Sequence, residues 1–205
     1  MLLVVGNKNY SSWSLRPWIA MKVLGLPFAE KRIALYRPGS KEEILRHSPA
    51  GKVPILQDGN TVVWDSLAIL EYLAERHPQL WPTDAAERAK ARAISAEMHS
   101  GFAHLRQHMS MNVRKRYPGK GRTPEVLAEI ARIQSIWDGA RGPFLFGAFG
   151  AADAMYAPVV LRFRTYEVDV CPEYTKAMLA LPAMKEWIAA AEVEAESLPQ
   201  FELYG

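Results

Sequence analysis

The stretch from residue 48 to residue 70 constrains the fold more than any other part of the chain. It reads Ser-Pro-Ala-Gly-Lys-Val-Pro-Ile-Leu-Gln-Asp-Gly-Asn-Thr-Val-Val-Trp-Asp-Ser-Leu-Ala-Ile-Leu. Pro54 follows a turn and precedes an apolar run, so we expect it at the start of a strand, where its missing N–H is tolerated. Asp58-Gly59 is typical of a hairpin turn, and residues 61–64 have the composition of a returning strand. The stretch therefore predicts two antiparallel strands.

A helix is expected directly after this hairpin. Asp65 and Ser66 are good N-cap residues, and an apolar run with helical spacing follows them. The free N–H groups and partial positive charge at the start of such a helix suit a carboxylate. A cis bond between Val53 and Pro54 is expected, and it would turn the backbone groups of Val53 outward, where they can pair with an extended peptide. A small peptide that carries an α-carboxylate would fit both features.

Residues 51–56 and 65–69 together resemble the glutathione-binding half of the glutathione transferase superfamily. The family pattern is a Val-Pro turn, a hairpin, and a Glu, Gln or Asp followed by Ser at the start of a helix. This resemblance implies a thioredoxin-like domain in which the backbone of Val53 pairs with the cysteinyl part of glutathione. It also implies that Asp65 and Ser66 hold the γ-glutamyl end. The implied glutathione-binding residues are Ser12, Lys52, Val53, Pro54, Asp65 and Ser66.

The residues before residue 48 agree with this layout. The apolar run at residues 2–5 predicts a buried strand, and residues 30–36 predict a second one. Between them Ser14 is expected to cap a helix that has Pro17 in its first turn, where the missing N–H costs nothing. Strand, helix and strand followed by a hairpin and a helix is the thioredoxin-like order of elements.

The second half of the chain is predicted to be entirely helical. Apolar residues recur at three- and four-residue steps over residues 94–109 and 126–137. Asp153 is expected to accept a hydrogen bond from the Gly150 N–H at the start of a later helix, which is half of a capping box. Two prolines break helix ahead of this half. We therefore expect a thioredoxin-like α/β domain at residues 1–78 that binds glutathione, a linker at residues 79–84, and an all-α substrate domain at residues 85–205.

The candidate catalytic residue lies in the loop formed by residues 9–16, which joins the first strand to the first helix. This loop resembles the Ser-Ser-Cys-x-x-Arg loop of the zeta class, also known as maleylacetoacetate isomerases, and implies a bacterial, serine-type member in which Ser11 stabilises the glutathione thiolate. One hydrogen bond to a charged acceptor contributes about 1.5 to 3 kcal/mol, and a helix N-terminus about 0.3 to 1. Together they can lower the thiol pKa by the roughly two units that ionisation at pH 7 requires. Tyr10 and Ser12 are the alternative donors, because tyrosine classes use a phenol near this position and Ser12 adjoins Ser11.

Two departures from the zeta pattern limit what the resemblance implies. Trp13 stands at the cysteine position of the loop. Thr165 stands where the class has its substrate-side arginine, with Arg164 one residue away. The thiolate-stabilising serine is therefore carried over to this chain, and the isomerase substrate is not.

Composition narrows the function classes further. A net charge of +3 and a pI of about 9.0 can favour acidic small molecules without implying nucleic acid, and no apolar segment is long enough to span a membrane. Residues 114–122 form a basic run that predicts a solvated turn, with a cationic rim over the substrate pocket as the alternative. His104 and His108 have helical metal-pair spacing but no third ligand, so no metal is expected. Cys171 is the only cysteine in the chain, so an intrachain disulfide is excluded, and a single free thiol fits the cytoplasm. We expect Cys171 to be a partly buried structural thiol.

We therefore expect a glutathione transferase that uses glutathione as its cosubstrate and stabilises the thiolate for attack on a small hydrophobic or acidic electrophile. A glutathione-dependent isomerase, a peroxidase, and a glutathione-binding module with little activity remain as alternatives, because fold does not decide function. The resemblance also implies a homodimer. The physiological electrophile cannot be read from the sequence, because shape and not a motif defines the pocket of the second domain.

Overall fold

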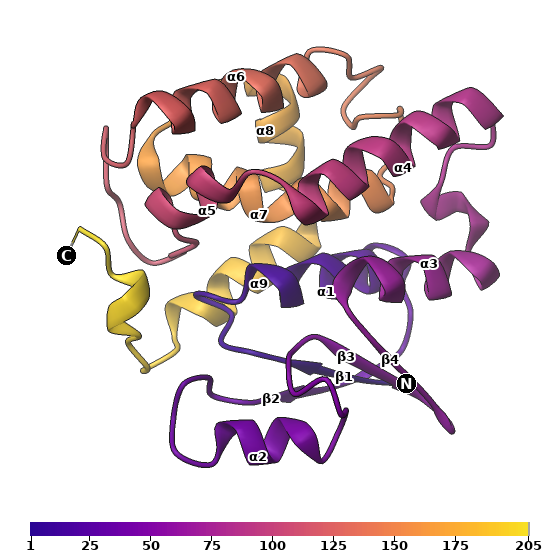
Figure 1. The fold of residues 1–205 in the computed structure, drawn as a ribbon. Coiled ribbons are helices and arrows are strands. Elements are labelled where there is room, and N and C mark those ends of the chain that lie inside the picture. Colours follow the sequence, from indigo (N-terminus) through magenta and orange to yellow (C-terminus); the bar gives the residue numbers. More distant parts are fainter. Residues whose placement is uncertain (205) are drawn as a thin grey trace.

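The computed structural model describes residues 1–204 and places a four-stranded sheet beneath a group of helices (Figure 1). The sheet has the strand order β2-β1-β3-β4. Its strands are Leu2–Val5 (β1), Ala29–Arg32 (β2), Ile55–Asp58 (β3) and Thr61–Trp64 (β4). β1 and β2 are parallel, whereas β1 with β3 and β3 with β4 are antiparallel. A parallel pair joined to an antiparallel hairpin is the predicted thioredoxin-like layout, which the structure confirms.

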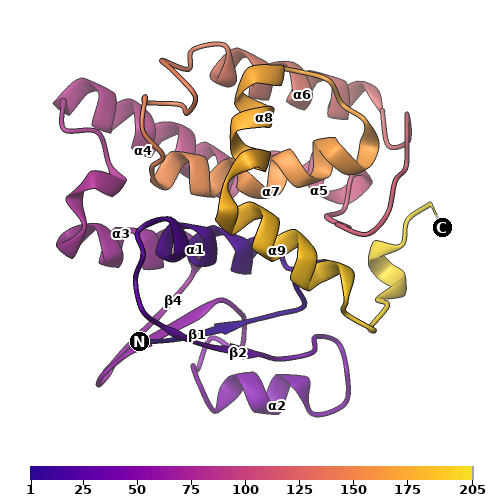
Figure 2. The same cartoon turned by 180° about the vertical axis from the view of Figure 1, so that it is seen from behind.

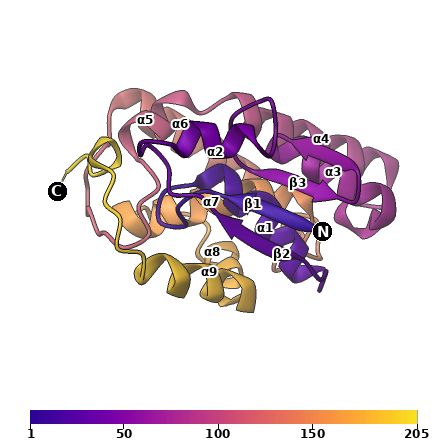
Figure 3. The ribbon, with the colours of Figure 1, turned by 90° about the horizontal axis from the view of Figure 1, so that it is seen from below.

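Helices cover both faces of the sheet, as two opposite views show (Figures 1 and 2). Ser12–Val23 (α1) and Ser66–Arg76 (α3) lie on the face toward the helical half, and Ser40–Leu45 (α2) lies on the other. The side chains of alternate residues in β1 point to opposite faces of the sheet. Leu3 and Val5 belong to the main core, whereas Val4 packs in a small cluster with Ile44 of α2. The view from below shows the strands in front of α1 (Figure 3). Helix α2 was not predictable from the sequence pattern.

Helix α1 begins earlier than expected. Its N-cap is Ser11 and not Ser14. The Ser14 hydroxyl instead accepts hydrogen bonds from the Gly6 N–H at 3.1 Å and from the Ser11 hydroxyl at 2.7 Å. Pro17 therefore lies inside the helix and leaves only the carbonyl of Trp13 without its helical donor. The expected second strand at residues 30–36 is also shifted, because β2 spans Ala29–Arg32 and only the Ile33 N–H beyond it still bonds to Val5 of β1.

The second half contains six α-helices within the described residues. They are Ala85–Ser100 (α4), Ala103–His108 (α5), Pro124–Trp137 (α6), Ala151–Tyr166 (α7), Pro172–Ala180 (α8) and Pro182–Glu192 (α9). Short 3₁₀ helices occur at Pro78–Leu80, which overlaps the start of the expected linker at residues 79–84, and at Pro199–Phe201. The apolar repeat over residues 94–109 is not one helix, because the chain breaks at Gly101 and Phe102 has a φ of +57°. None of the helices described is long and apolar enough to cross a bilayer.

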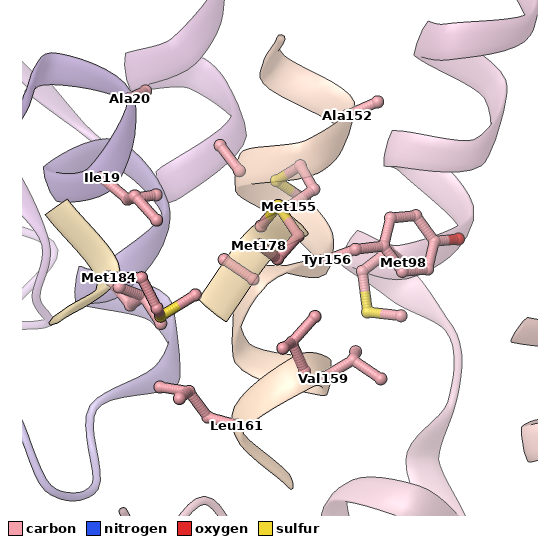
Figure 4. Close-up of a cluster of buried hydrophobic side chains, with 14 of the residues drawn as sticks. Ile19, Ala20, Met98, Ala152, Met155, Tyr156, Val159, Leu161, Met178 and Met184 are labelled. Atoms are coloured by element: carbon pink, nitrogen blue, oxygen red, sulfur yellow. The ribbon is translucent and has the colours of Figure 1, made fainter. Parts of the chain in front are cut away.

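One continuous apolar core joins the two halves of the chain. Ile19 and Ala20 of α1, Met155 of α7 and Met184 of α9 all belong to this core (Figure 4). Helix α7 is buried along nearly its whole length, since it packs against both α1 and α4. The sheet and the helical half are therefore held in one arrangement, which fixes the walls of any cavity between them.

The predicted half capping box at the start of α7 is confirmed. Asp153 accepts from the Gly150 N–H at 2.9 Å with one carboxylate oxygen, and from the Leu145 N–H at 3.0 Å with the other. The structure also explains the glycine, because a Cβ at Gly150 would lie 2.8 Å from the Leu80 carbonyl oxygen. A hydroxyl residue would collide with the segment that enters the helical half.

Candidate functional site

A cavity of about 1000 Å³ opens between the sheet half and helices α5 and α7. Every residue predicted from the sequence to act on glutathione contributes to its wall. These residues are Ser11, Ser12, Lys52, Val53, Pro54, Asp65 and Ser66. The rival Tyr10 lies on the same wall. The structure thus brings the candidate residues together, while the role of each one remains a prediction.

The Val53–Pro54 turn forms one edge of the cavity. The peptide bond between the two residues is cis, as expected. Strand β3 begins only at Ile55, which pairs with Val4 of β1. The backbone N–H and C=O of Val53 bond to no other residue between 1 and 204. They are therefore free to pair with an extended ligand.

The start of α3 forms a second part of the wall. Asp65 caps this helix by accepting from the N–H groups of Leu67 at 2.9 Å and Ala68 at 3.3 Å. It does so with a φ of +74°, which is uncommon for any residue but glycine. The buried Ser66 hydroxyl accepts from a guanidinium nitrogen of Arg16 at 3.1 Å. Because Arg16 can only donate, the proton of Ser66 remains available to an acceptor in the cavity.

The start of α1 forms the third part. Ser11 is the N-cap, and its side chain is not used to cap the helix. The N–H groups of Trp13 and Ser14 find no acceptor among the described residues, as expected at a helix N-terminus. Ser12 accepts a long hydrogen bond of 3.4 Å from Arg162. Donor groups and the positive end of the helix dipole therefore converge at Ser11, where an anion would be stabilised.

The Tyr10 hydroxyl is engaged with the C-terminal segment. It donates to the Glu202 carboxylate and accepts from Arg114 at 3.0 Å and from the Leu198 N–H at 3.3 Å. The Tyr10 ring also stacks on Phe201, with ring centroids 5.6 Å apart. This hydroxyl has no remaining donor for a thiolate, which favours Ser11 over Tyr10.

The wall of the cavity is strongly cationic. Its charged residues are Arg37, Lys41, Lys52, Arg106 and Arg162 against the single carboxylate of Asp65. The alternative interpretation of residues 114–122 as a cationic rim is wrong, since none of them lines the cavity and Arg114 donates to the carbonyl groups of Glu194 and Glu196. Arg106 and Arg162 were not predicted from the sequence as residues of the site. An available signal was Arg162, which interrupts the apolar face of a predicted helix.

The arginines near the cavity affect one another. Burial, followed by the charges of Arg106 and Arg162, lowers the pKa of Arg16 to about 9. Burial and the charge of Arg106 likewise lower the pKa of Arg162 to about 9. Both guanidinium groups therefore stay protonated at pH 7. The Trp13 ring on the cavity wall lies 4.3 Å from the guanidinium carbon of Arg16 and 5.1 Å from that of Arg106, which are cation–π distances.

The remaining candidates lie away from the cavity. The hydroxyl of Thr165, at the position of the zeta-class arginine, donates to carbonyl oxygens of Asn112 and Leu161, and Arg164 approaches Glu192 at 3.8 Å. Burial and the nearby Asp138 carboxylate raise the pKa of the Cys171 thiol to about 12, so it is a weak nucleophile. Within residues 1–204 no three His, Cys, Asp or Glu side chains gather as a metal site would require.

Comparison with known proteins gives two family matches. Residues 10–76 match the family model described as glutathione S-transferase, N-terminal domain. Residues 85–190 match the model described as glutathione S-transferase, C-terminal domain. The two matches together cover most of the chain.

Individual relatives point the same way. The chain is 30% identical over 193 residues to the maleylacetoacetate isomerase of Rattus norvegicus, covering 87% of each chain. It is 28% identical over 172 residues to a probable maleylacetoacetate isomerase of Caenorhabditis elegans, covering 80% of this chain and 79% of that protein. Among solved structures, a bacterial maleyl pyruvate isomerase of the zeta class shares the fold with a TM-score of 0.71 and 24% identity, covering 96% of this chain and all of the other. A glutathione transferase homologue from Burkholderia with bound glutathione has a TM-score of 0.70 and 23% identity over 93% of this chain and 97% of the other.

Proposed function

The chain belongs to the glutathione S-transferase family, and on that premise we propose that its cavity binds glutathione and presents the thiol to Ser11 for attack on a small electrophile. One observation carries the proposal. The unpaired backbone of Val53, the start of α3 and the start of α1 all face the same cavity.

Glutathione is an extended peptide with two carboxylates and one ammonium group, and the wall offers a partner for each kind of group. The backbone of Val53 pairs with the cysteinyl amide. The start of α3, with the Ser66 hydroxyl, receives the α-carboxylate of the γ-glutamyl residue, while the Asp65 carboxylate attracts its ammonium group. Lys52, which lines the same cavity, attracts the glycyl carboxylate. In this pose the cysteinyl sulfur lies toward α1.

Ser11 stabilises the thiolate in this proposal. In the structure the Ser11 hydroxyl donates to the Ser14 hydroxyl oxygen, which also accepts from the Gly6 N–H. The proton of Ser14 can therefore turn toward Ser11, which releases the proton of Ser11 for the sulfur. The free N–H groups at the start of α1 add to this stabilisation. A lower thiol pKa increases the fraction of the reactive thiolate at pH 7.

The reaction is then a nucleophilic attack by sulfur. The thiolate forms a carbon–sulfur bond with the electrophilic carbon, and the leaving group departs with its electron pair. The chain supplies orientation and thiolate stabilisation, whereas the electrophile supplies the leaving group. The second substrate enters from the side of α5 and α7, which the glutathione pose leaves open.

A glutathione-dependent isomerisation is the second candidate function. It is favoured by the names of the two curated relatives reported above, one a maleylacetoacetate isomerase and the other a probable one. The Ser11-Ser12 pair agrees with that class, whereas Trp13 and Thr165 depart from it. Assaying maleylacetoacetate beside a generic aryl halide distinguishes the two candidates.

We also propose that the protein is a cytoplasmic homodimer. The exposed side chains of Val62 and Trp64 on edge strand β4 support an interface there, next to Asp65 on the cavity wall. The free thiol of Cys171 agrees with a reducing compartment. Light scattering tests the oligomeric state.

Calorimetry with glutathione tests the proposed function. We expect saturable binding in the millimolar range or tighter, and weaker binding for Ser66→Ala, which removes a hydroxyl from the start of α3. S-methylglutathione serves as the matched ligand, because it keeps the peptide contacts and cannot ionise at sulfur. The proposal is wrong if glutathione does not bind at millimolar concentration, or if Ser66→Ala leaves the affinity unchanged.

A further inference from the structure

We propose that Arg106 of α5 and Arg162 of α7 form an anion subsite that binds a carboxylate of the electrophilic substrate. Both residues line the cavity on the side of the helical half, opposite the residues assigned to glutathione. The inference rests on the proposed function, because it names the class of the second substrate. That class is a small electrophile with a carboxylate near the reacting carbon.

The charges of these two arginines are not neutralised by the protein. Within residues 1–204 no carboxylate oxygen lies within 4.0 Å of either guanidinium group, whereas several arginines on the surface have such a partner. Arg162 is also nearly inaccessible, with 6% of its surface exposed. A buried cation without a counterion is costly, so an anionic ligand would relieve both its desolvation and its repulsion from Arg106.

Both guanidinium groups keep donors that are not used. Arg106 donates to the carbonyl groups of Gly101 and Met98 through Nε and Nη2, which leaves Nη1 without a partner among the described residues. Arg162 donates to the Met109 carbonyl and to Ser12, which leaves its Nε without one. A guanidinium group has five N–H donors, and a carboxylate is its best-matched acceptor. The hydrogen bonds within the protein therefore hold the two side chains in place and leave N–H donors of both guanidinium groups free for a ligand.

The subsite lies beside the proposed position of the sulfur. Arg162 Nη2 is 3.4 Å from the Ser12 hydroxyl oxygen, and Ser12 follows Ser11 in the chain. A carboxylate bound there would be only a few bonds from the carbon that the thiolate attacks. The anion would thus orient the electrophile as well as anchor it.

Two other cationic residues on the wall lie on the glutathione side. Lys52 lies by the Val53 turn, and Lys41 donates to the Gly51 carbonyl at 2.9 Å, so both belong to the glutathione side. Thr165 and Arg164 do not line the cavity. Arg162, one turn before Thr165 on α7, is the arginine that this helix presents to the cavity.

A matched pair of electrophiles tests the subsite. 4-Chloro-3-nitrobenzoate and 4-chloro-3-nitrobenzamide both lose chloride, with its electron pair, when the thiolate forms the carbon–sulfur bond. We expect kcat/KM for the benzoate, divided by its uncatalysed rate with glutathione, to exceed the same ratio for the benzamide by about tenfold or more, the effect of one charge-assisted hydrogen bond. Arg106→Gln should remove most of this preference, and Arg106→Lys should keep part of it.

Two controls separate a subsite from a fold defect. Arg132→Gln removes an exposed arginine of α6 that pairs with Glu97, and it should leave the preference unchanged. Calorimetry should show that Arg106→Gln keeps the affinity for S-methylglutathione. The same experiment should show 3-nitrobenzoate binding to the protein saturated with S-methylglutathione, and about tenfold weaker binding to Arg106→Gln.

The outcomes distinguish this inference from the proposed function. Equal normalised rates for the two electrophiles in the wild-type protein would overturn the subsite, even if glutathione binds. So would a preference that survives in both Arg106→Gln and Arg162→Gln. If glutathione does not bind but 3-nitrobenzoate does, and Arg106→Gln abolishes that binding, the subsite stands and only the proposed function is wrong.

Discussion

At the scale of single residues, the proposed role of the Ser11 hydroxyl is to stabilise the thiolate. We expect Ser11→Ala to raise the pH midpoint of conjugation with a generic aryl halide by about one unit or more. The reason is that a hydrogen bond to a charged acceptor contributes about 1.5 to 3 kcal/mol, and one pKa unit corresponds to about 1.4 kcal/mol. The pH dependence of kcat/KM for the aryl halide, measured at saturating glutathione, gives the midpoint of the protein–glutathione complex.

Tyr10→Phe is the matched control for this measurement. The Tyr10 hydroxyl donates its proton to Glu202 and accepts from Arg114, so it has no proton left for a thiolate in the cavity. Its loss should therefore leave the pH midpoint unchanged. Ser12→Ala tests the other rival and should change the midpoint less than Ser11→Ala does. A midpoint that moves in Tyr10→Phe and stays fixed in Ser11→Ala contradicts the serine-type mechanism.

At the scale of elements, the start of α3 depends on Asp65. This residue caps the helix with its carboxylate and holds a φ of +74°. We expect Asp65→Ala to lower the free energy of unfolding by about 1 to 3 kcal/mol, because it loses a cap and places an alanine in a backbone region that disfavours it. Urea denaturation gives the change in stability, and calorimetry should show weaker glutathione binding.

Two further variants separate the cap from the backbone strain. Asp65→Asn keeps an acceptor for the cap and tolerates positive φ, so it should cost less stability than alanine. Asp65→Gly removes the side chain but relieves the backbone, and a glycine cap costs only a few tenths of a kcal/mol. If the alanine variant proves as stable as the asparagine and glycine variants, neither the cap nor the backbone strain affects the stability of this element.

The elements show what the sequence could reveal about the fold. The hairpin, the cis bond at Pro54 and the cap at Asp65 were predictable, because proline, Asp-Gly and Asp-Ser act locally. The start of α1 was not, since the Ser14 hydroxyl bonds to Gly6, eight residues away. Helix α2 has only six residues and only two buried side chains, Ser40 and Ile44, so it has little periodic signal. The break at Phe102 interrupts an apolar repeat that continues unchanged in the sequence.

The candidate site was likewise predictable from the sequence only in part. The residues that line the cavity from the first half lie in short motifs, so Ser11, Val53 and Ser66 could be proposed from local pattern. Arg106 and Arg162 lie 56 positions apart on two helices, and only the packing of α5 and α7 brings both to the cavity. The sequence pattern marks them as single charges in apolar helices and does not say which cavity they face.

At the scale of the whole molecule, helix α7 connects the two halves. It packs against α1 from the sheet half and against α4 from the helical half. Its first turn is held by Asp153, whose side chain is 1% exposed and bonds to the backbone on two sides. The ionisation of this carboxylate therefore affects the stability of the whole fold.

Burial raises the pKa of Asp153 from 3.8 to about 6, although its two backbone hydrogen bonds act in the opposite direction. Between about pH 4 and pH 6 the folded protein thus keeps a proton that the unfolded chain has already released. The free energy of unfolding contributed by this group is fully present below about pH 4 and falls as pH rises to 6. A shift of about two units corresponds to roughly 3 kcal/mol.

The variant Asp153→Asn should remove this pH dependence. Asparagine has one acceptor oxygen for two N–H donors, so we expect the variant to be less stable than the wild-type protein at pH 4.5. The difference should shrink by roughly 2 kcal/mol at pH 7, because only the wild-type protein then carries a buried charge. Urea denaturation of both proteins at the two pH values measures this difference in the free energy of unfolding. The contributions of the other carboxylates cancel because both chains contain them. A difference that is the same at pH 4.5 and pH 7 means that Asp153 ionises alike in the folded and unfolded chains.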